Sequence, residues 1–101
     1  MANRLTLQTK LEVLLGSRNV YYQPPSTVNM NYPAIVYSKA QPNRRFANDK
    51  TYINKSCYEL TVIDKKPDNP IIDKLMELPY CSFNRHYVSD NLNHDVLTIY
   101  Y

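Results

Sequence analysis

The second half of the chain follows a strand, helix, strand order that only a few small folds accommodate. Apolar and polar side chains alternate from about Thr51 to Asp64, which predicts a strand with one buried face. A helix is predicted over Ile71–Leu78, because Asn69 can cap its start and Pro70 suits its first position. This order indicates a sheet braced by a short helix.

Four further strands are predicted, two before this unit in the sequence and two after it. Pro79 ends the helix, and a turn over 90–94 separates the last two strands. The two strands upstream are short runs of residues with strand propensity. The predicted strands are Val20–Gln23, Ala34–Tyr37, Tyr80–Asn84 and His94–Tyr101.

A first helix is predicted over Leu5–Leu15. Its buried stripe is expected to consist of four leucines at helical spacing, namely Leu7, Leu11, Leu14 and Leu15. Gly16 is the only glycine in the chain and follows this stripe at once. A glycine in that place suits the left-handed residue that commonly ends a helix.

These elements predict one α+β domain over residues 1–101. A chain of this length holds a single modest core. The expected fold is a small, largely antiparallel or mixed sheet of about four to five strands with two helices on one face, in the order α-β-β-β-α-β-β. The core is expected to include Leu11, Leu14, Leu60, Val62, Ile71 and Leu75.

Tyrosine supplies most of the aromatic surface, since the chain has ten Tyr, two Phe and no Trp. An apolar ring with a polar tip suits half-buried sheet faces and protein interfaces. The neighbours Tyr21 and Tyr22, and likewise Tyr100 and Tyr101, are therefore candidate subunit contacts. In the alternative, each pair is one core residue beside one exposed neighbour, as strand alternation requires.

A basic segment lies between Ser38 and Lys55, where five basic residues accompany one acid. The segment has no periodic pattern, and long loops inside a compact domain are usually functional or disordered. It could bind phosphates or an acidic protein surface, or it could be a loop kept solvated by its charge. The candidate contact residues are Lys39, Arg44, Arg45, Phe46 and Lys50.

Reactive chemistry finds little support in the sequence. A single glycine excludes the phosphate-binding loops of the Walker and dinucleotide types, which need several. No acid, base and nucleophile cluster along the chain. The soft metal ligands show no paired spacing; they are Cys57, Cys81, His86 and His94. We therefore expect no enzymatic activity, no catalytic or metal site and no cofactor.

No membrane contact is expected. The start of the chain, Met1–Leu5, contains no apolar signal segment, and the longest aliphatic run, Val13–Leu15, is too short to span a bilayer. The protein is therefore expected to be made in the cytoplasm, with Cys57 and Cys81 as reduced thiols.

Several short phrases resemble the tail-terminator and head-tail joining (tail completion) proteins of long-tailed bacteriophages. They are V-Y-Y-Q-P-P at Val20–Pro25, Y-P-A-I-V-Y at Tyr32–Tyr37, V-I-D at Val62–Asp64 and D-N-L-N-H at Asp90–His94. The resemblance implies a non-enzymatic virion protein, made in the bacterial host cytoplasm. Its copies would form a ring, commonly a hexamer, at the head-proximal end of the tail. The ring would contact the tail-tube protein and the head connector or stopper, and DNA would pass through it.

Two other functions stay open. One is a neighbouring connector component of the same virion, such as an adaptor or stopper. The other is a small nucleic-acid-binding regulator, which is expected to carry a basic recognition helix or stacking aromatics on a basic sheet. The first predicted helix carries Lys10, and the second carries Lys74 beside Asp73 and Glu77, which argues against the regulator.

Overall fold

The structure, a computed structural model of the chain, describes residues 4–24, 29–40 and 56–101. Within these ranges it contains two helices and five strands that form a single sheet in the order β1-β2-β3-β5-β4. The elements are α1 (Arg4–Leu15), β1 (Val20–Tyr22), β2 (Ala34–Lys39), β3 (Cys57–Asp64), α3 (Ile71–Met76), β4 (Cys81–Ser89) and β5 (Leu92–Tyr100).

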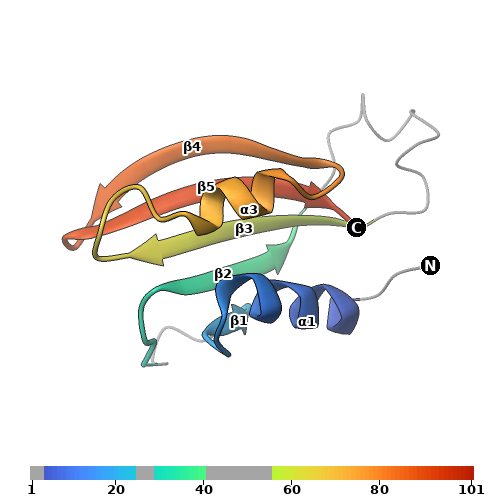
Figure 1. Cartoon of the computed structure of the whole chain (residues 1–101), viewed down its shortest axis with the longest axis horizontal. Helices are drawn as coiled ribbons and strands as arrows, with labels where there is room; N and C mark the ends of the chain where they lie inside the picture. The colour runs from blue at the N-terminus through green and yellow to red at the C-terminus, as the bar shows by residue number, and fades with distance from the viewer. Residues whose placement is uncertain (1–3, 25–28, 41–55) are drawn as a thin grey trace.

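The sheet is mixed, because β1 pairs in parallel with β2 while the other three pairings are antiparallel. Both helices lie on the same face of the sheet, with α1 over β1 and β2 at one side and α3 nearer β4 at the other (Figure 1). The predicted α+β fold, its element order and its helix-covered face are therefore confirmed.

One core fills the space between the helices and the sheet. At its centre Leu60 of β3 lies opposite Tyr37 of β2 and Leu97 of β5, and all three are almost fully buried. Of the predicted core, Leu14 is only partly buried and packs against the cluster from outside. The others are buried as expected, namely Leu11, Leu60, Val62, Ile71 and Leu75.

The first helix ends where the sequence indicates. Gly16 has a φ of 80°, and its backbone N–H donates to the carbonyl of Glu12 at 2.9 Å. A left-handed residue directly after the last turn closes the helix in this way, and glycine adopts that conformation without a steric penalty.

A buried tyrosine anchors α1 to the sheet. The hydroxyl of Tyr37, on β2, donates to Oε1 of Gln8 and accepts from Nη1 of Arg4 at 3.3 Å. Gln8 also donates through Nε2 to the carbonyl of Val20 on β1 at 3.0 Å. Burial raises the pKa of Tyr37, and the Arg4 contact opposes that rise only in part. These bonds fix α1 over the edge of the sheet formed by β1.

The second helix is shorter than predicted. Asn69 does cap its start, because its Oδ1 accepts the backbone N–H of Ile71 at 2.9 Å. The helix nevertheless ends at Met76. Glu77 and Leu78 donate to the carbonyls three residues before them, at 3.3 and 3.0 Å. Such bonds tighten the last turn toward 3₁₀ geometry, so the predicted end at Leu78 was two residues too long.

The last two strands form one long hairpin, and here the prediction was too cautious. Only Asp90 and Asn91 form the turn, with φ values of 53° and 62°. Two residues with positive φ make the tight hairpin turn that matches strand twist, and Asp and Asn tolerate this conformation best after glycine. The strands therefore extend to Ser89 and from Leu92, beyond the predicted limits Asn84 and His94.

The predicted strand from Thr51 is described only from Cys57, since residues 51–55 lie outside the described ranges.

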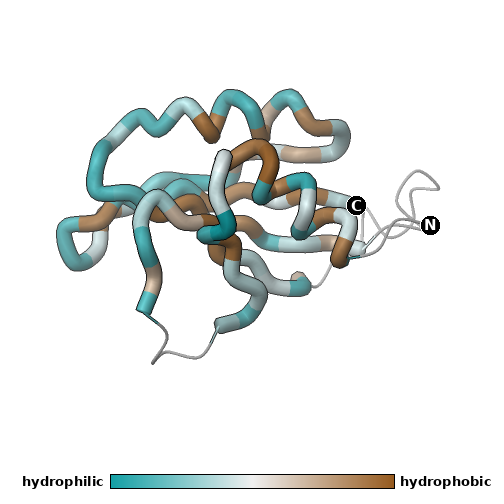
Figure 2. The backbone as a smooth tube through the Cα atoms, turned by 60° about the horizontal axis from the view of Figure 1, so that its bottom comes forward, coloured by the Kyte–Doolittle hydropathy of each residue, from teal (hydrophilic) through white to brown (hydrophobic). Residues whose placement is uncertain are grey.

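Hydrophobic and hydrophilic segments alternate along the backbone in Figure 2. In the part of the chain that the structure describes, neither helix is long and apolar enough to cross a membrane.

Candidate functional site

A groove of the described surface runs between α1 and the turn that follows α3. It has a volume of about 710 Å³ and is bounded on its other side by Leu78, in the turn that follows α3. We call it the α1 groove. The α1 residues that line it are Leu5, Thr6, Thr9, Lys10, Val13 and Leu14.

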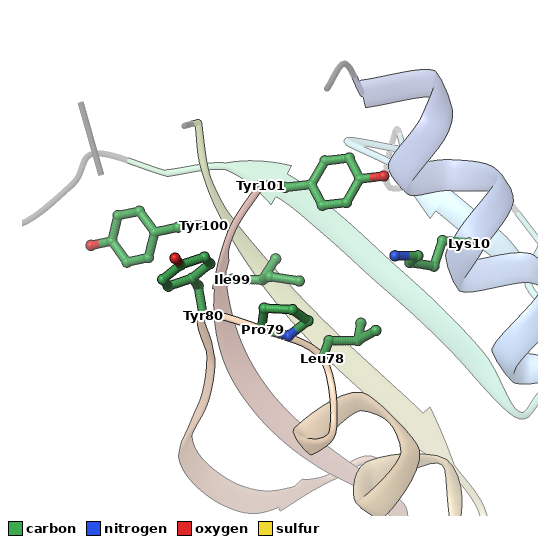
Figure 3. Close-up of a pocket in the computed structure, with 7 residues that line it drawn as sticks. All are labelled: Lys10, Leu78, Pro79, Tyr80, Ile99, Tyr100 and Tyr101. Atoms are coloured by element: carbon green, nitrogen blue, oxygen red, sulfur yellow. The ribbon is translucent and has the colours of Figure 1, made fainter. Parts of the chain in front are cut away.

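The α1 groove continues into a smaller hollow of about 210 Å³ at the end of β5 (Figure 3). Lys10 and Leu78 line both hollows, so the two are continuous. The smaller hollow is closed by Pro79, Tyr80 and Tyr101. In Figure 3 the ring of Tyr101 points toward α1, and the Lys10 ammonium lies 5.7 Å from its centroid.

Large aliphatic side chains of the α1 groove are exposed to an unusual degree. Leu5 is 64% exposed and Val13 is 73% exposed, while Tyr80 is 44% exposed. Single exposed apolar residues are common, but several that share one groove typically mark an interaction site. Among the described residues that line the two hollows, Lys10 is the only charged one, so the groove is suited to an apolar partner surface.

Of the predicted tyrosine contacts, Tyr100 and Tyr101 both line the smaller hollow that continues the α1 groove. Tyr100 is 8% exposed and its ring points away from Tyr101 in Figure 3, as strand alternation requires. Tyr21 and Tyr22 are half-buried. The hydroxyl of Tyr21 accepts the backbone N–H of Asn31, and the ring of Tyr22 packs 4.9 Å from that of Tyr37.

The predicted basic contact is described at one residue only. Lys39 is exposed at the end of β2. The other four residues lie outside the described ranges; they are Arg44, Arg45, Phe46 and Lys50.

The cysteines lie on opposite faces of the sheet and both are free thiols. Burial raises the pKa of Cys81 to about 11 and also raises that of Cys57. The attacking form of cysteine is the thiolate, so both side chains are protonated and poorly nucleophilic at neutral pH.

Both histidines also contact side chains of the neighbouring strand within the hairpin. Nδ1 of His86 lies 2.7 Å from Oδ1 of Asp95 on the opposite strand. The ring of His94 stacks on Tyr87, with 4.6 Å between centroids and 9° between planes. Among the described residues, no group of three or more His, Cys, Asp or Glu could hold a metal ion.

A second, polar hollow of about 370 Å³ surrounds the His86–Asp95 pair at the start of α3. Asp68, Asn69 and Asp73 line its other side. A histidine oriented by a carboxylate can act as a base only when a nucleophile or a substrate proton lies within reach. The pair instead ties β4 to β5 across the sheet.

Sequence reasoning missed Leu5, Val13, Leu78 and Tyr80 as candidate contacts. A signal was present, because Leu5, Thr9 and Val13 recur every four residues and so form a second stripe on the helix. The position of this stripe relative to Leu78 depends on how the helices pack, which periodicity alone does not give.

A scan against protein-family models finds no match to this chain, and neither a search of the curated proteins nor one of the solved structures finds any.

Proposed function

We propose that this protein is a structural subunit of a bacteriophage tail, which forms a ring at the head-proximal end of the tail and joins it to the head connector. The proposal rests on the phrases that resemble tail-terminator and head-tail joining proteins. Its partners would be further copies of itself, the tail-tube protein and the connector or stopper, within the virion.

The observation that carries the proposal is the α1 groove. Leu5 and Val13 place large aliphatic side chains in solvent on one flank of the subunit, next to Tyr80 and Tyr101. Burial of this surface by a neighbouring copy would remove apolar area from water, at roughly 25 cal/mol per Å². A ring needs such a surface on one side of each subunit, paired with a different surface of the next.

The chemistry of the described residues fits a structural role. The thiol pKa values are raised, the histidines are engaged within the hairpin, and the α1 groove offers hydrophobic contact with a single charge. Surfaces of this kind serve association better than catalysis.

Loss of the protein from its phage tests the function. Electron microscopy of lysates made without it should show tails that fail to join heads or that exceed their normal length. Normal infectious particles assembled without the protein would contradict the proposal.

We also propose that the basic segment contacts an acidic neighbouring ring or the path of the DNA. Replacement of Arg44 and Arg45 by Glu would turn attraction into repulsion at such a contact. Joining of heads to tails should then fall sharply. Thermal stability is measured alongside joining, and a change within about 0.5 kcal/mol would separate a lost contact from lost folding.

A matched control is available in the turn before α3. Lys65 and Lys66 are also adjacent and basic, and both are exposed. Their double replacement by Glu makes the same change in net charge at another site and should leave joining intact. Equal assembly by both double variants would show that the basic segment is only a solvated surface.

A further inference from the structure

The outer strand β4 is the most exposed element of the described sheet. It pairs with β5 on one side, and no strand of the described ranges lies on its other side. Every residue from Ser82 to Ser89 is exposed, including Phe83, Tyr87 and Val88 at 44%, 40% and 62%. An unpaired edge of this length offers a row of backbone groups to another chain.

The backbone groups that point away from the sheet follow from the hairpin geometry. A two-residue turn is closed by a hydrogen-bonded pair, here Ser89 with Leu92. Hydrogen-bonded and non-bonded pairs then alternate along an antiparallel ladder. His86 and Val88 therefore belong to non-bonded pairs, and their N–H and C=O groups point outward.

The regular part of this edge is Arg85–Ser89. A register shift between Phe83 and Arg85 interrupts the pairing with β5, whereas the pairs from Arg85 to Ser89 are continuous. Bulges bend an edge and so protect it from pairing. The five residues beyond the bulge lack that protection, and they contain neither Pro nor Lys.

Arg85 gives this edge a positive charge that no acid of β4 offsets. Cys81–Ser89 contains Arg85 and His86 but no acid. Asp95 already pairs with His86, whereas no carboxylate of the described residues pairs with Arg85. The guanidinium of Arg85 lies instead over the ring of Tyr87, 5.5 Å from its centroid. This arrangement favours an acidic neighbour beside Arg85.

We propose that β4 is a docking strand for an extended acidic segment of a partner protein, which adds antiparallel to Arg85–Ser89 as a sixth strand. Hydrogen bonds to His86 and Val88 would hold the backbone of the segment. An acid opposite Arg85 and apolar residues opposite His86 and Val88 would set its register. The inference goes beyond the ring and does not depend on it, because Arg85–Ser89 shares no residue with the α1 groove or with the smaller hollow that continues it.

A designed peptide provides the test. In acetyl-Thr-Val-Thr-Val-Glu-Thr-amide, the two valines would face Val88 and His86 and the glutamate would face Arg85. Titration of the isotope-labelled full chain, followed by NMR up to millimolar peptide, should shift the β4 amide signals. Replacement of the peptide glutamate by lysine should weaken binding about fivefold or more.

Backbone variants separate strand addition from other binding. N-methylation of both peptide valines removes the donors that face β4 and should weaken binding at least about tenfold. N-methylation of the central threonine, whose N–H points away, should weaken it far less. In the protein, Val88→Pro removes an outward donor and keeps the ladder to β5, whereas Val88→Thr keeps both. Only the proline variant should lose binding.

Several results would overturn the inference. The first is that neither peptide shifts the β4 signals. The second is that the glutamate and lysine peptides bind equally well. The third is that the proline and threonine variants bind the peptide equally well. Self-association of the free chain that Val88→Pro abolishes would assign the edge to a second copy instead. Each outcome is read from peptide binding or from the β4 edge, so a failure here leaves the ring proposal standing.

Discussion

The two outer strands of the sheet are opposites. At one side β1 has three residues, its Val20 is 6% exposed, and α1 lies over it with Gln8 bonded to the Val20 carbonyl. At the other side β4 has nine residues and is exposed on both faces. The difference shows that this fold closes one edge with a helix and leaves the other edge open.

The contrast extends to the kind of contact that each side offers. Beside β1, the helix that closes the edge presents apolar side chains in the α1 groove. At β4 the free groups are mainly those of the backbone, together with Arg85, which pairs with no carboxylate of the described residues. One subunit can therefore offer two chemically different surfaces, one along α1 and one along β4, which lie at different sides of the sheet (Figure 1).

The largest loss of stability is expected when the packing of α1 over the β1 edge is weakened. Leu11 is fully buried beneath α1, and Leu11→Ala should lower the free energy of unfolding by about 2 to 5 kcal/mol because it leaves a cavity. Leu5 lies on the same helix but is 64% exposed. Leu5→Ala should cost the isolated subunit no more than about 0.5 kcal/mol. Equal losses in urea melts would mean that α1 is not packed as described.

Matched valines on the two outer strands compare the edges directly. Val20 on β1 is 6% exposed and Val88 on β4 is 62% exposed. Val20→Ala should destabilise the protein by roughly 1 to 3 kcal/mol, since two buried methyl groups are lost. Val88→Ala should change stability by less than about 0.5 kcal/mol. A larger loss for Val88→Ala in the same melts would contradict an open β4 edge.

Much of this contrast could be predicted from the sequence, and the remainder has a physical explanation. Apolar periodicity and Gly16 located α1, and alternation located β3 with its buried residues Leu60 and Val62. The second half of β4 escaped prediction because both of its faces are exposed, so Arg85–Ser89 shows no apolar alternation. The α1 groove escaped because it depends on the packing of α1 against the turn after α3.

A loss of stability similar to that of Val20→Ala should follow from removing the hydroxyl that holds α1 over β1. Tyr37→Phe deletes the group that bonds Gln8 and Arg4, while the ring stays in the core. The expected loss is about 1 to 3 kcal/mol, because the polar partners in this partly buried site lose their bond. Tyr22→Phe is the control, and it should cost less in the same thermal or urea melts. An unchanged melt for Tyr37→Phe would show that the network does not hold the helix.

The pH dependence of Cys81 alkylation tests whether the first residue of β4 is buried, and so where the exposed part of this strand begins. Its pKa is raised from 9.0 to about 11 by burial. A raised thiol pKa adds stability below the ordinary value, and this contribution disappears as the pH rises from about 9 toward 11. Alkylation by iodoacetamide, followed by mass spectrometry, should therefore increase up to about pH 11 in the folded chain. The urea-unfolded chain should show a midpoint near the ordinary thiol pKa of 9.0, and the same midpoint in the folded chain would place Cys81 in solvent.

Sedimentation velocity of three matched proteins over a range of concentrations tests most directly whether the α1 groove joins copies of the chain. Wild type should form one closed oligomer, and Val13→Glu should stay monomeric, because it places a charge in the groove. Val88→Glu, which places the same charge on the β4 edge, should assemble as wild type does. An oligomer of Val13→Glu identical to that of wild type, or a wild type that remains monomeric at every concentration, would contradict the account.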